Sequence, residues 1–168
     1  MMQTVVITDA SVLINFLVLD RAELLARLPT HSFVVTDHVR AEITQHYSDQ
    51  LQRLEQAFSA GILQEISVSD LAEVQTFASL TAQGLGVGEC SAIAVAMHRH
   101  FTLAIDDRQA IKKIANLGCQ IAVLTTENVI VLLIQQNVLA IEEADAMKLE
   151  WEQNYRFRLM FASFRERI

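Results

Sequence analysis

The stretch that decides the fold is TVVITDASVLINF, residues 4–16. Its first five residues are rich in β-branched side chains and predict a short strand that is buried on both faces. Asp9 follows this strand at once, and the apolar run 12–19 predicts a helix. In an open α/β sheet, ligands bind outside the carboxyl ends of the strands. Asp9 is therefore expected to place a carboxylate where a ligand would bind.

The remainder of the chain repeats this alternation of strands and helices. Further strands are predicted at 32–36, 62–68, 101–105 and 120–124, with helices between and after them. Asp20, Asp37 and Thr126 are expected to cap helices, because Asp and Thr accept a hydrogen bond from the first turn. The inner side of a helix at 69–83 is expected to carry Leu71 and Val74.

This element order predicts an α/β three-layer sandwich, with a mainly parallel central sheet of about 4–5 strands flanked by helices. No linker, internal repeat or low-complexity tract divides the chain. Residues 1–168 are therefore predicted to form a single domain, and residues 126–168 to be a C-terminal helical extension of that domain.

Composition narrows the classes of protein that the chain can belong to. The 168 residues are 52% hydrophobic, with one Pro and five Gly, as in a compact helix-rich domain. The longest apolar runs are too short to span a bilayer, and Asp9 interrupts the apolar start, so neither a membrane protein nor a signal peptide is expected. Cys90 and Cys119 form no metal-binding or CxxC pattern. They are expected to be free thiols in a reducing cytoplasm.

The net charge of −7 argues against a protein that coats nucleic acid through a broad basic face. It is compatible with an enzyme that grips a phosphodiester through bound metal ions, because the ions neutralise the carboxylates that ligate them.

Five acidic residues are expected at the same edge of the sheet, since each follows a predicted strand or opens a helix: Asp9, Glu42, Glu89, Asp106 and Asp107. A helix N-terminus stabilises an exposed carboxylate by roughly 0.3–1 kcal/mol, which is also an ordinary reason for acidic residues there. Clustered carboxylates repel one another, and a divalent cation relieves that repulsion. Oxygen ligands select Mg²⁺ or Mn²⁺ over Zn²⁺, and such ions suit phosphodiester hydrolysis.

Four short segments resemble the motifs of PIN-domain nucleases. They are TDAS at 8–11, DHVRAE at 37–42, GECSAIA at 88–94 and LAIDDR at 103–108. Their acidic residues are separated by 33, 47 and 18 positions, and the resemblance runs from about residue 5 to residue 124. The Gly-Glu pair and the later Asp-Asp-Arg are similar to the branch that contains the toxins of prokaryotic toxin–antitoxin pairs.

The resemblance implies a Mg²⁺- or Mn²⁺-dependent endoribonuclease that cuts single-stranded RNA, leaves a 5′-phosphate and a 3′-hydroxyl, and is held in check by an antitoxin protein. Ser11 would hydrogen-bond a metal-bound water or orient the neighbouring carboxylate, and Asp106 would be an additional metal ligand. Many family members carry Asp where this chain has Glu89. The implied catalytic residues are Asp9, Glu42, Glu89 and Asp107.

Several alternatives are open at this stage. The chain can instead be a catalytically inactive PIN-like module that binds RNA or protein, and a phosphatase-like or receiver-like protein ranks third. Basic side chains after the acidic pair can hold RNA phosphates or form a solvated helix face; they are Arg108, Lys112 and Lys113. The C-terminal arginines, from Arg156 to Arg167, can be an RNA arm, a partner contact or a solvated tail. The apolar side chains between Val12 and Leu28 are either core or a surface for a homodimer or an inhibitor.

Overall fold

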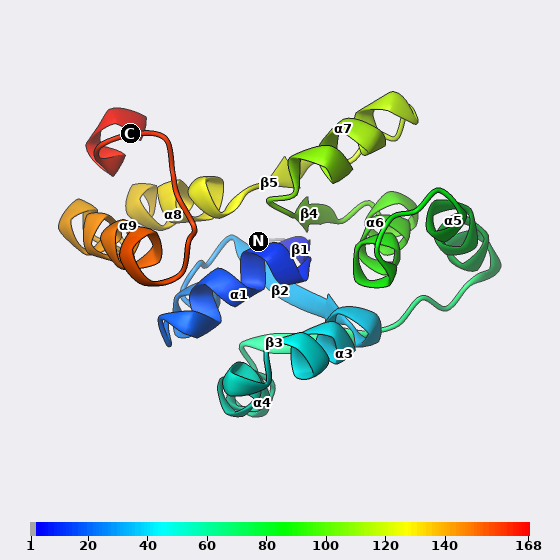
Figure 1. The fold of residues 1–168 in the computed structure, drawn as a ribbon, viewed down its shortest axis with the longest axis horizontal. Coiled ribbons are helices and arrows are strands. Elements are labelled where there is room, and N and C mark those ends of the chain that lie inside the picture. The colour runs from blue at the N-terminus through cyan, green and yellow to red at the C-terminus, as the bar shows by residue number, and fades with distance from the viewer. Residues whose placement is uncertain (1–2) are drawn as a thin grey trace.

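A computed structural model describes residues 3–168 of the chain. Its centre is a sheet of five strands in the order β3-β2-β1-β4-β5 (Figure 1), and every adjacent pair of strands is parallel. The predicted α/β fold with a parallel sheet between helices is confirmed. The strands are β1 (Thr4–Thr8), β2 (His31–Thr36), β3 (Leu63–Ile66), β4 (Thr102–Ala104) and β5 (Val123–Leu124).

The first strand lies in the middle of the sheet and has helices on both sides. Val6 pairs with Phe33 of β2, and Ile7 pairs with Leu103 of β4. Val6 and Ile7 point to opposite faces of the pleat and belong to separate hydrophobic clusters, yet both are 0% exposed. Burial on both faces explains why Val5, Val6 and Ile7 form an unbroken apolar run instead of alternating with polar residues.

One face of the sheet is covered by helices from both ends of the chain, which build the larger hydrophobic cluster. Phe16 and Trp151 meet edge to face in this cluster, with ring centroids 6.3 Å apart. The segment after Tyr155 folds back so that Phe164 is also buried there. The helices are α1 (Ala10–Val18), α2 (Glu23–Ala26), α3 (Asp37–His46), α4 (Leu51–Ser59), α8 (Thr126–Gln135), α9 (Ile141–Asn154) and η2 (Phe164–Arg167). The short helix η1 (Ser48–Gln50) joins α3 to α4 and buries no residue.

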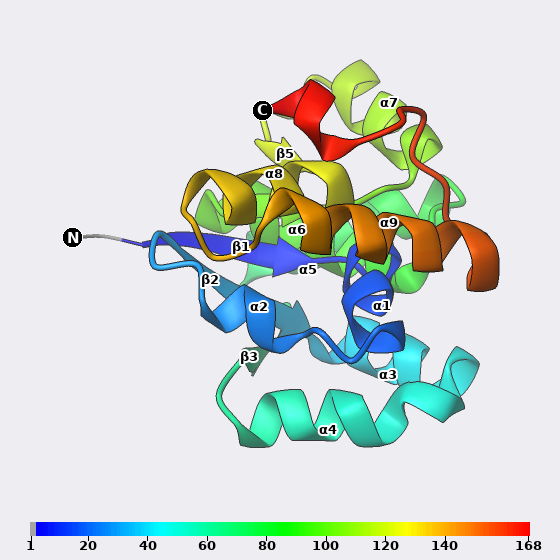
Figure 2. The ribbon, with the colours of Figure 1, turned by 90° about the vertical axis from the view of Figure 1, so that its left-hand side faces the viewer.

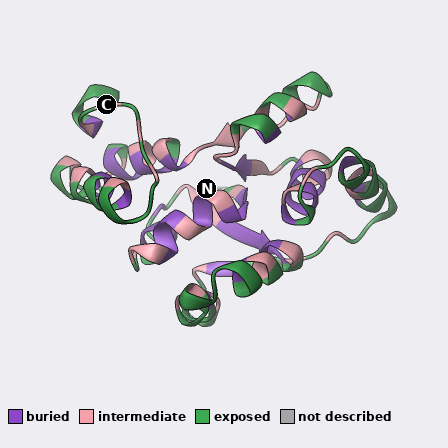
Figure 3. Cartoon of the chain, viewed as in Figure 1, coloured by how far each residue is buried: buried purple, intermediate pink, exposed green. Residues whose placement is uncertain are grey.

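The opposite face is covered by three helices from the middle of the chain, α5 (Leu71–Ala82), α6 (Val87–Arg99) and α7 (Arg108–Asn116). The central part of α6 is buried almost completely, whereas α5 and α7 expose one side (Figure 3). Two small residues, Ala92 and Ala96, let α6 lie close to the sheet.

Three predicted helix caps are wrong. Thr36, and not Asp37, caps α3: its backbone is extended and its hydroxyl accepts a hydrogen bond from the Val39 amide. Thr125, and not Thr126, caps α8 in the same way. Asp20 does not cap α2, which begins after Ala22 without any side-chain cap. At α3 and α8, the threonine one residue before the predicted cap has the extended backbone that a cap requires, and its hydroxyl accepts the hydrogen bond.

The prediction that Leu71 and Val74 lie on the inner side of α5 is also wrong. Leu71 is 71% exposed and Val74 is 45% exposed, whereas the acidic residue between them, Glu73, is 1% exposed. Arg99 at the end of α6 explains the inversion, because its guanidinium donates to both oxygens of Glu73 at 2.7 and 3.0 Å. A bidentate ion pair can compensate for the burial of a carboxylate.

Six apolar residues between Val12 and Leu28 form core and not a docking surface. The six that the sequence singled out are each at most 2% exposed: Val12, Leu13, Phe16, Leu17, Leu24 and Leu28. Within residues 3–168, none of the helices has the length and apolar character needed to cross a bilayer.

Candidate active site

Asp9 lies at the carboxyl end of the central strand, where it caps α1. Its Oδ2 atom accepts hydrogen bonds from the Ser11 amide at 3.1 Å and from the Ser11 hydroxyl at 2.7 Å. Its Oδ1 atom is buried and has no hydrogen-bond partner among the described residues. Burial raises the pKa of Asp9, and the bonds from Ser11 only partly offset this effect. One oxygen of Asp9 is thus fixed in place while the other is left for a ligand.

Ser11 ties the first strand to its neighbour. Its hydroxyl donates to Asp9 and accepts a hydrogen bond from the Asp106 amide at 3.0 Å. The side chain therefore holds the end of β4 against the start of α1, and it orients Asp9.

Glu42 approaches from α3 and lies against the N-terminal turn of α6. A Cβ atom on Gly88 would overlap Oε2 of Glu42, so glycine leaves room for this carboxylate where it now lies. The pKa of Glu42 is raised by burial and by the charge of Asp9, and His46 has a smaller opposing effect.

Glu89 is the third residue of α6, which begins two residues earlier than the sequence predicted. Burial, the charges of Asp9 and Asp107, a hydrogen bond with Asp107 and the charge of Glu42 together raise the pKa of Glu89 to about 8. Its Oε2 atom is buried and, within the part of the chain that the structure covers, has no hydrogen-bond partner. Glu89 therefore favours its protonated form until a cation or another partner compensates the neighbouring charges.

The neighbouring residues Asp106 and Asp107 have different hydrogen-bond partners and different roles. Asp107 caps α7, with Oδ1 accepting from the amides of Gln109 at 2.9 Å and Ala110 at 3.2 Å. Asp106 instead accepts from Thr126 on both oxygens and also from the Asn15 amide group at 3.2 Å. Asp107 faces Glu89 and Asp9, whereas the oxygens of Asp106 are already engaged in joining β4 to α8.

The structure thus brings these four carboxyl groups together: the charges of Asp9, Asp107 and Glu42 raise the pKa of Glu89, and the charge of Asp9 raises that of Glu42. Among residues 3–168, no three His, Cys, Asp or Glu side chains have the geometry of a ready-made metal site. The donor set nevertheless fits a divalent cation, because two buried carboxylate oxygens lack partners and the pKa values of three clustered carboxyl groups are raised. A cation would satisfy those oxygens and remove the repulsion.

The basic residues on α7 differ in whether their side chains are already hydrogen-bonded within the protein. Arg108 and Lys112 are exposed, whereas the Lys113 ammonium donates to the Gln83 carbonyl at 2.8 Å. In the C-terminal segment, Arg165 pairs with Glu142 and Arg167 with Glu127, at 3.6 and 3.2 Å. These last two arginines lie against α9 and α8 and do not form a free arm.

Two residues that support the site were not predicted from the sequence. Asn15 is 6% exposed, and its amide group donates to Asp106, to Thr126 and to the Ser11 carbonyl. Thr126 is fully buried and holds Asp106. A signal for Asn15 was present, since it is the one polar residue in the apolar run 12–19. No local signal marks Thr126, whose partner lies 20 positions away.

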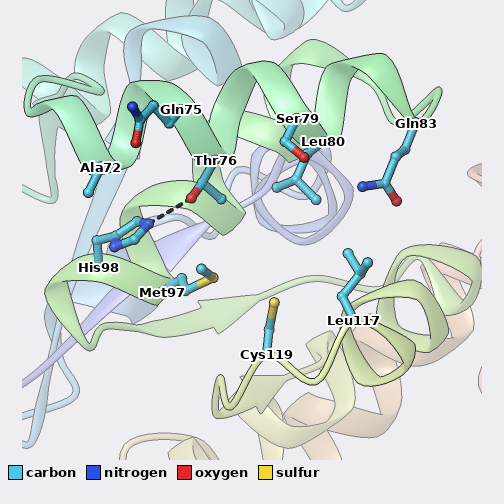
Figure 4. Close-up of a pocket in the computed structure, with 10 residues that line it drawn as sticks. All are labelled: Ala72, Gln75, Thr76, Ser79, Leu80, Gln83, Met97, His98, Leu117 and Cys119. Atoms are coloured by element: carbon cyan, nitrogen blue, oxygen red, sulfur yellow. Dashed lines mark hydrogen bonds between the residues drawn. The ribbon is translucent and has the colours of Figure 1, made fainter.

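A cavity of about 350 Å³ lies elsewhere, between α5 and the C-terminal ends of α6 and α7 (Figure 4). His98 faces it and is hydrogen-bonded to the Thr76 hydroxyl at 2.7 Å. None of the five acidic site residues lines this cavity. His98 thus has a hydrogen-bond partner on α5.

Comparison with known proteins identifies the class. The family model described as PIN domain matches residues 5–162, so the chain belongs to the PIN-domain family. A comparison with curated proteins finds no match.

Two solved archaeal structures are similar to this chain. The protein PAE2754 from Pyrobaculum aerophilum has a TM-score of 0.53 at 15% identity, over 79% of this chain and 91% of that one. A PilT N-terminus domain protein, SSO1118 from Sulfolobus solfataricus P2, has a TM-score of 0.45 at 19% identity, over 74% and 89%. At this identity the first likeness supports the fold alone. PIN domains are generally nucleases that use divalent metal ions, which places this chain among the hydrolases at that coarse level.

Proposed function

We propose that this protein is a Mg²⁺- or Mn²⁺-dependent endoribonuclease that hydrolyses phosphodiester bonds of single-stranded RNA. The observation that carries the proposal is the pair of partnerless buried oxygens, one on Asp9 and one on Glu89, in a cluster of four carboxyl groups. Burying polar oxygens without partners destabilises the folded state, and a ligand bound at the cluster would offset that effect.

The residues of the chain have separate tasks in this reaction. Asp9, Glu42, Glu89 and Asp107 would hold the cation, with Asp9 oriented by Ser11 and Asp107 by the first turn of α7. When bound, the cation lowers the pKa of a coordinated water and neutralises charge on the phosphate. Gly88 leaves space for Glu42, and Asp106 keeps β4 and α8 at the correct separation. The products would be a 5′-phosphate and a 3′-hydroxyl.

The test is an assay of the purified protein on labelled single-stranded RNA with Mn²⁺ or Mg²⁺ and with EDTA. Cleavage should need the cation, and Asp9→Asn should lower its rate by at least roughly 100-fold, more than the loss of a residue that only orients a ligand. Asp70→Asn is a matched control, because Asp70 also caps a helix, accepting from the Glu73 amide at 2.9 Å, and Asn preserves the cap. Equal cleavage by wild type and Asp9→Asn would refute the assignment.

We further infer that the enzyme acts in the cytoplasm as the toxin of a toxin–antitoxin pair. The support is the Gly-Glu and Asp-Asp-Arg pattern of the sequence. A small adjacent gene whose DNA-binding product co-purifies with this chain and suppresses cleavage would bear out the inference. Co-expression that leaves cleavage unchanged would contradict it.

A further inference from the structure

A second cavity opens beside the acidic cluster. Its volume is about 360 Å³, and it lies between α1, the end of α3 with η1, and the end of α9. Figure 2 shows these three helix ends on the same side of the molecule. Ile14 and Val18, one turn apart on α1, provide its apolar lining, and Tyr47 and Tyr155 line it from α3 and α9. We call it the tyrosine groove.

The two tyrosines are exposed, and hydrogen bonds hold the backbone of both and the hydroxyl of Tyr155. Each is 42% exposed and follows the last residue of a helix. The Tyr47 amide donates to the Ile43 carbonyl at 2.8 Å, and the Tyr155 amide donates to the Trp151 carbonyl at 3.0 Å. The Tyr155 hydroxyl donates to the Val18 carbonyl at 3.3 Å. Exposed aromatic rings on fixed backbone are suited to stack on a planar ligand, since little side-chain freedom is lost on binding.

The tyrosine groove adjoins, through His46, the cavity that Glu42 of the acidic cluster lines. His46 lines both this groove and the adjoining cavity of about 470 Å³ that Glu42 and Gly88 line. Asn15 lines the groove too, and its amide group donates to Asp106. An RNA strand with a phosphate at the acidic cluster would therefore have a nearby nucleotide at the groove.

The polar groups around the groove suit a base better than a second phosphate. Asp49 and Gln50 of η1 line it, and a carboxylate and an amide can pair with the edge of a base but Asp49 would repel a phosphate. Arg156 follows Tyr155, is exposed, and forms no ion pair with any residue in the range 3–168. It is thus a positively charged side chain, next in sequence to a groove residue, in a chain of net charge −7.

We propose that the tyrosine groove binds one nucleobase of the single-stranded RNA, at a fixed position relative to the phosphodiester bond at the acidic cluster. The inference rests on the proposed function, because it requires an RNA strand at that cluster. Stacking on aromatic side chains accepts any base, so the groove would fix the register of the strand and not its sequence.

The test uses short RNA oligonucleotides in which one nucleotide at a time is abasic. Wild-type protein should cleave the intact strand normally, and one abasic position should slow cleavage by about 5- to 100-fold, as expected for the loss of one stacked base. Tyr47→Ala or Tyr155→Ala should slow cleavage of intact RNA by a similar factor, with no further loss at that abasic position. Tyr47→Phe should retain the rate. Leu71→Ala, an exposed apolar side chain on α5, is the matched control and should have no effect.

A second readout separates this inference from the proposed function. Binding of the same oligonucleotides to Asp9→Asn, followed by fluorescence anisotropy, should show the same dependence on the abasic position and on Tyr47. Tyrosine-dependent binding without cleavage by the wild type would refute the nuclease and keep the groove. Cleavage that is indifferent to both tyrosines would refute the groove and keep the nuclease. A change only in the oligomeric state of the tyrosine variants would mean that a second protein chain covers the groove, and would also refute it.

Discussion

At the scale of single residues, the site depends on how each carboxylate is engaged before any ligand arrives. Asp106 and Asp107 are adjacent in the chain, but Asp106 is held by Thr126 and Asn15, whereas Asp107 accepts on one oxygen from its own helix and faces Glu89. Sequence alone placed both in the cluster and could not divide their roles, because the partners of Asp106 come from distant segments.

This difference in hydrogen bonding predicts that two similar substitutions will affect stability and metal binding differently. Asp106→Asn puts an amide group opposite three donors and should destabilise the fold by about 1–3 kcal/mol. Asp107→Asn should leave the free energy of unfolding within about 0.5 kcal/mol, since Asn caps a helix as well as Asp, yet weaken metal binding. Urea denaturation with EDTA, together with Mn²⁺ titration, measures both. Equal stability of the two variants would contradict this difference in roles.

Gly88 supports a second prediction at this scale. Gly88→Ala should displace Glu42, because the added Cβ would overlap its Oε2 atom. Alanine favours the helix by up to about 1 kcal/mol, so the folded state should survive. Metal affinity and cleavage should fall by at least roughly 10-fold. Gly86→Ala, with the Glu89 Oε1 atom at 3.3 Å, should have the milder effect. A Gly88→Ala protein with unchanged metal affinity would show that Glu42 is not a ligand.

At the scale of elements, the sequence predicted what is local and missed what is not. The strand at 4–8 and the helix after it follow from adjacent side chains, and both are confirmed. The buried face of α5 depends on Arg99, which lies 26 positions from Glu73, and no periodicity within α5 reveals it. The caps at Thr36 and Thr125 differ from the predicted ones by a single residue, because neighbouring side chains were equally good candidates.

The pairing of α5 with α6 leads to a third prediction. Arg99→Met leaves the Glu73 carboxylate buried without its guanidinium and should destabilise the protein by about 1–3 kcal/mol. Arg99 holds the pKa of Glu73 below its usual range. The stabilisation by this pair is therefore present above the unfolded-state pKa and is lost as pH falls through the folded-state value. The difference in unfolding free energy between wild type and Arg99→Met should shrink in acid, and a constant difference would contradict this explanation.

At the scale of the whole molecule, the fold places its least satisfied charges at one edge of a parallel sheet. β1 lies between β2 and β4, so its carboxyl end is where the chain connections diverge to the two sides. That is the position at which open α/β sheets bind ligands. The positions of the acidic residues after predicted strands or at helix starts predicted their convergence, but not which oxygens would be left without partners.

The cluster should make the stability of the metal-free protein depend on pH. The pKa of Glu89 is raised to about 8 in the folded state, against an ordinary value of 4.5. Its contribution is therefore fully present below the unfolded-state pKa and is lost as pH rises towards 8. In EDTA, the melting temperature of wild type relative to Glu89→Gln should fall between pH 5 and pH 8. A difference that stays flat over that range would contradict the raised pKa.

The most direct test of the central claim, that these carboxylates bind one cation site together, is calorimetric titration of the protein with Mn²⁺ at pH 7. Wild type and Asp70→Asn should bind with release of roughly one proton, seen as a heat that varies with the buffer, because Glu89 must lose its proton to ligate. Asp9→Asn and Glu89→Gln should lose this binding. Equal Mn²⁺ binding by Asp9→Asn and by wild type would contradict the claim.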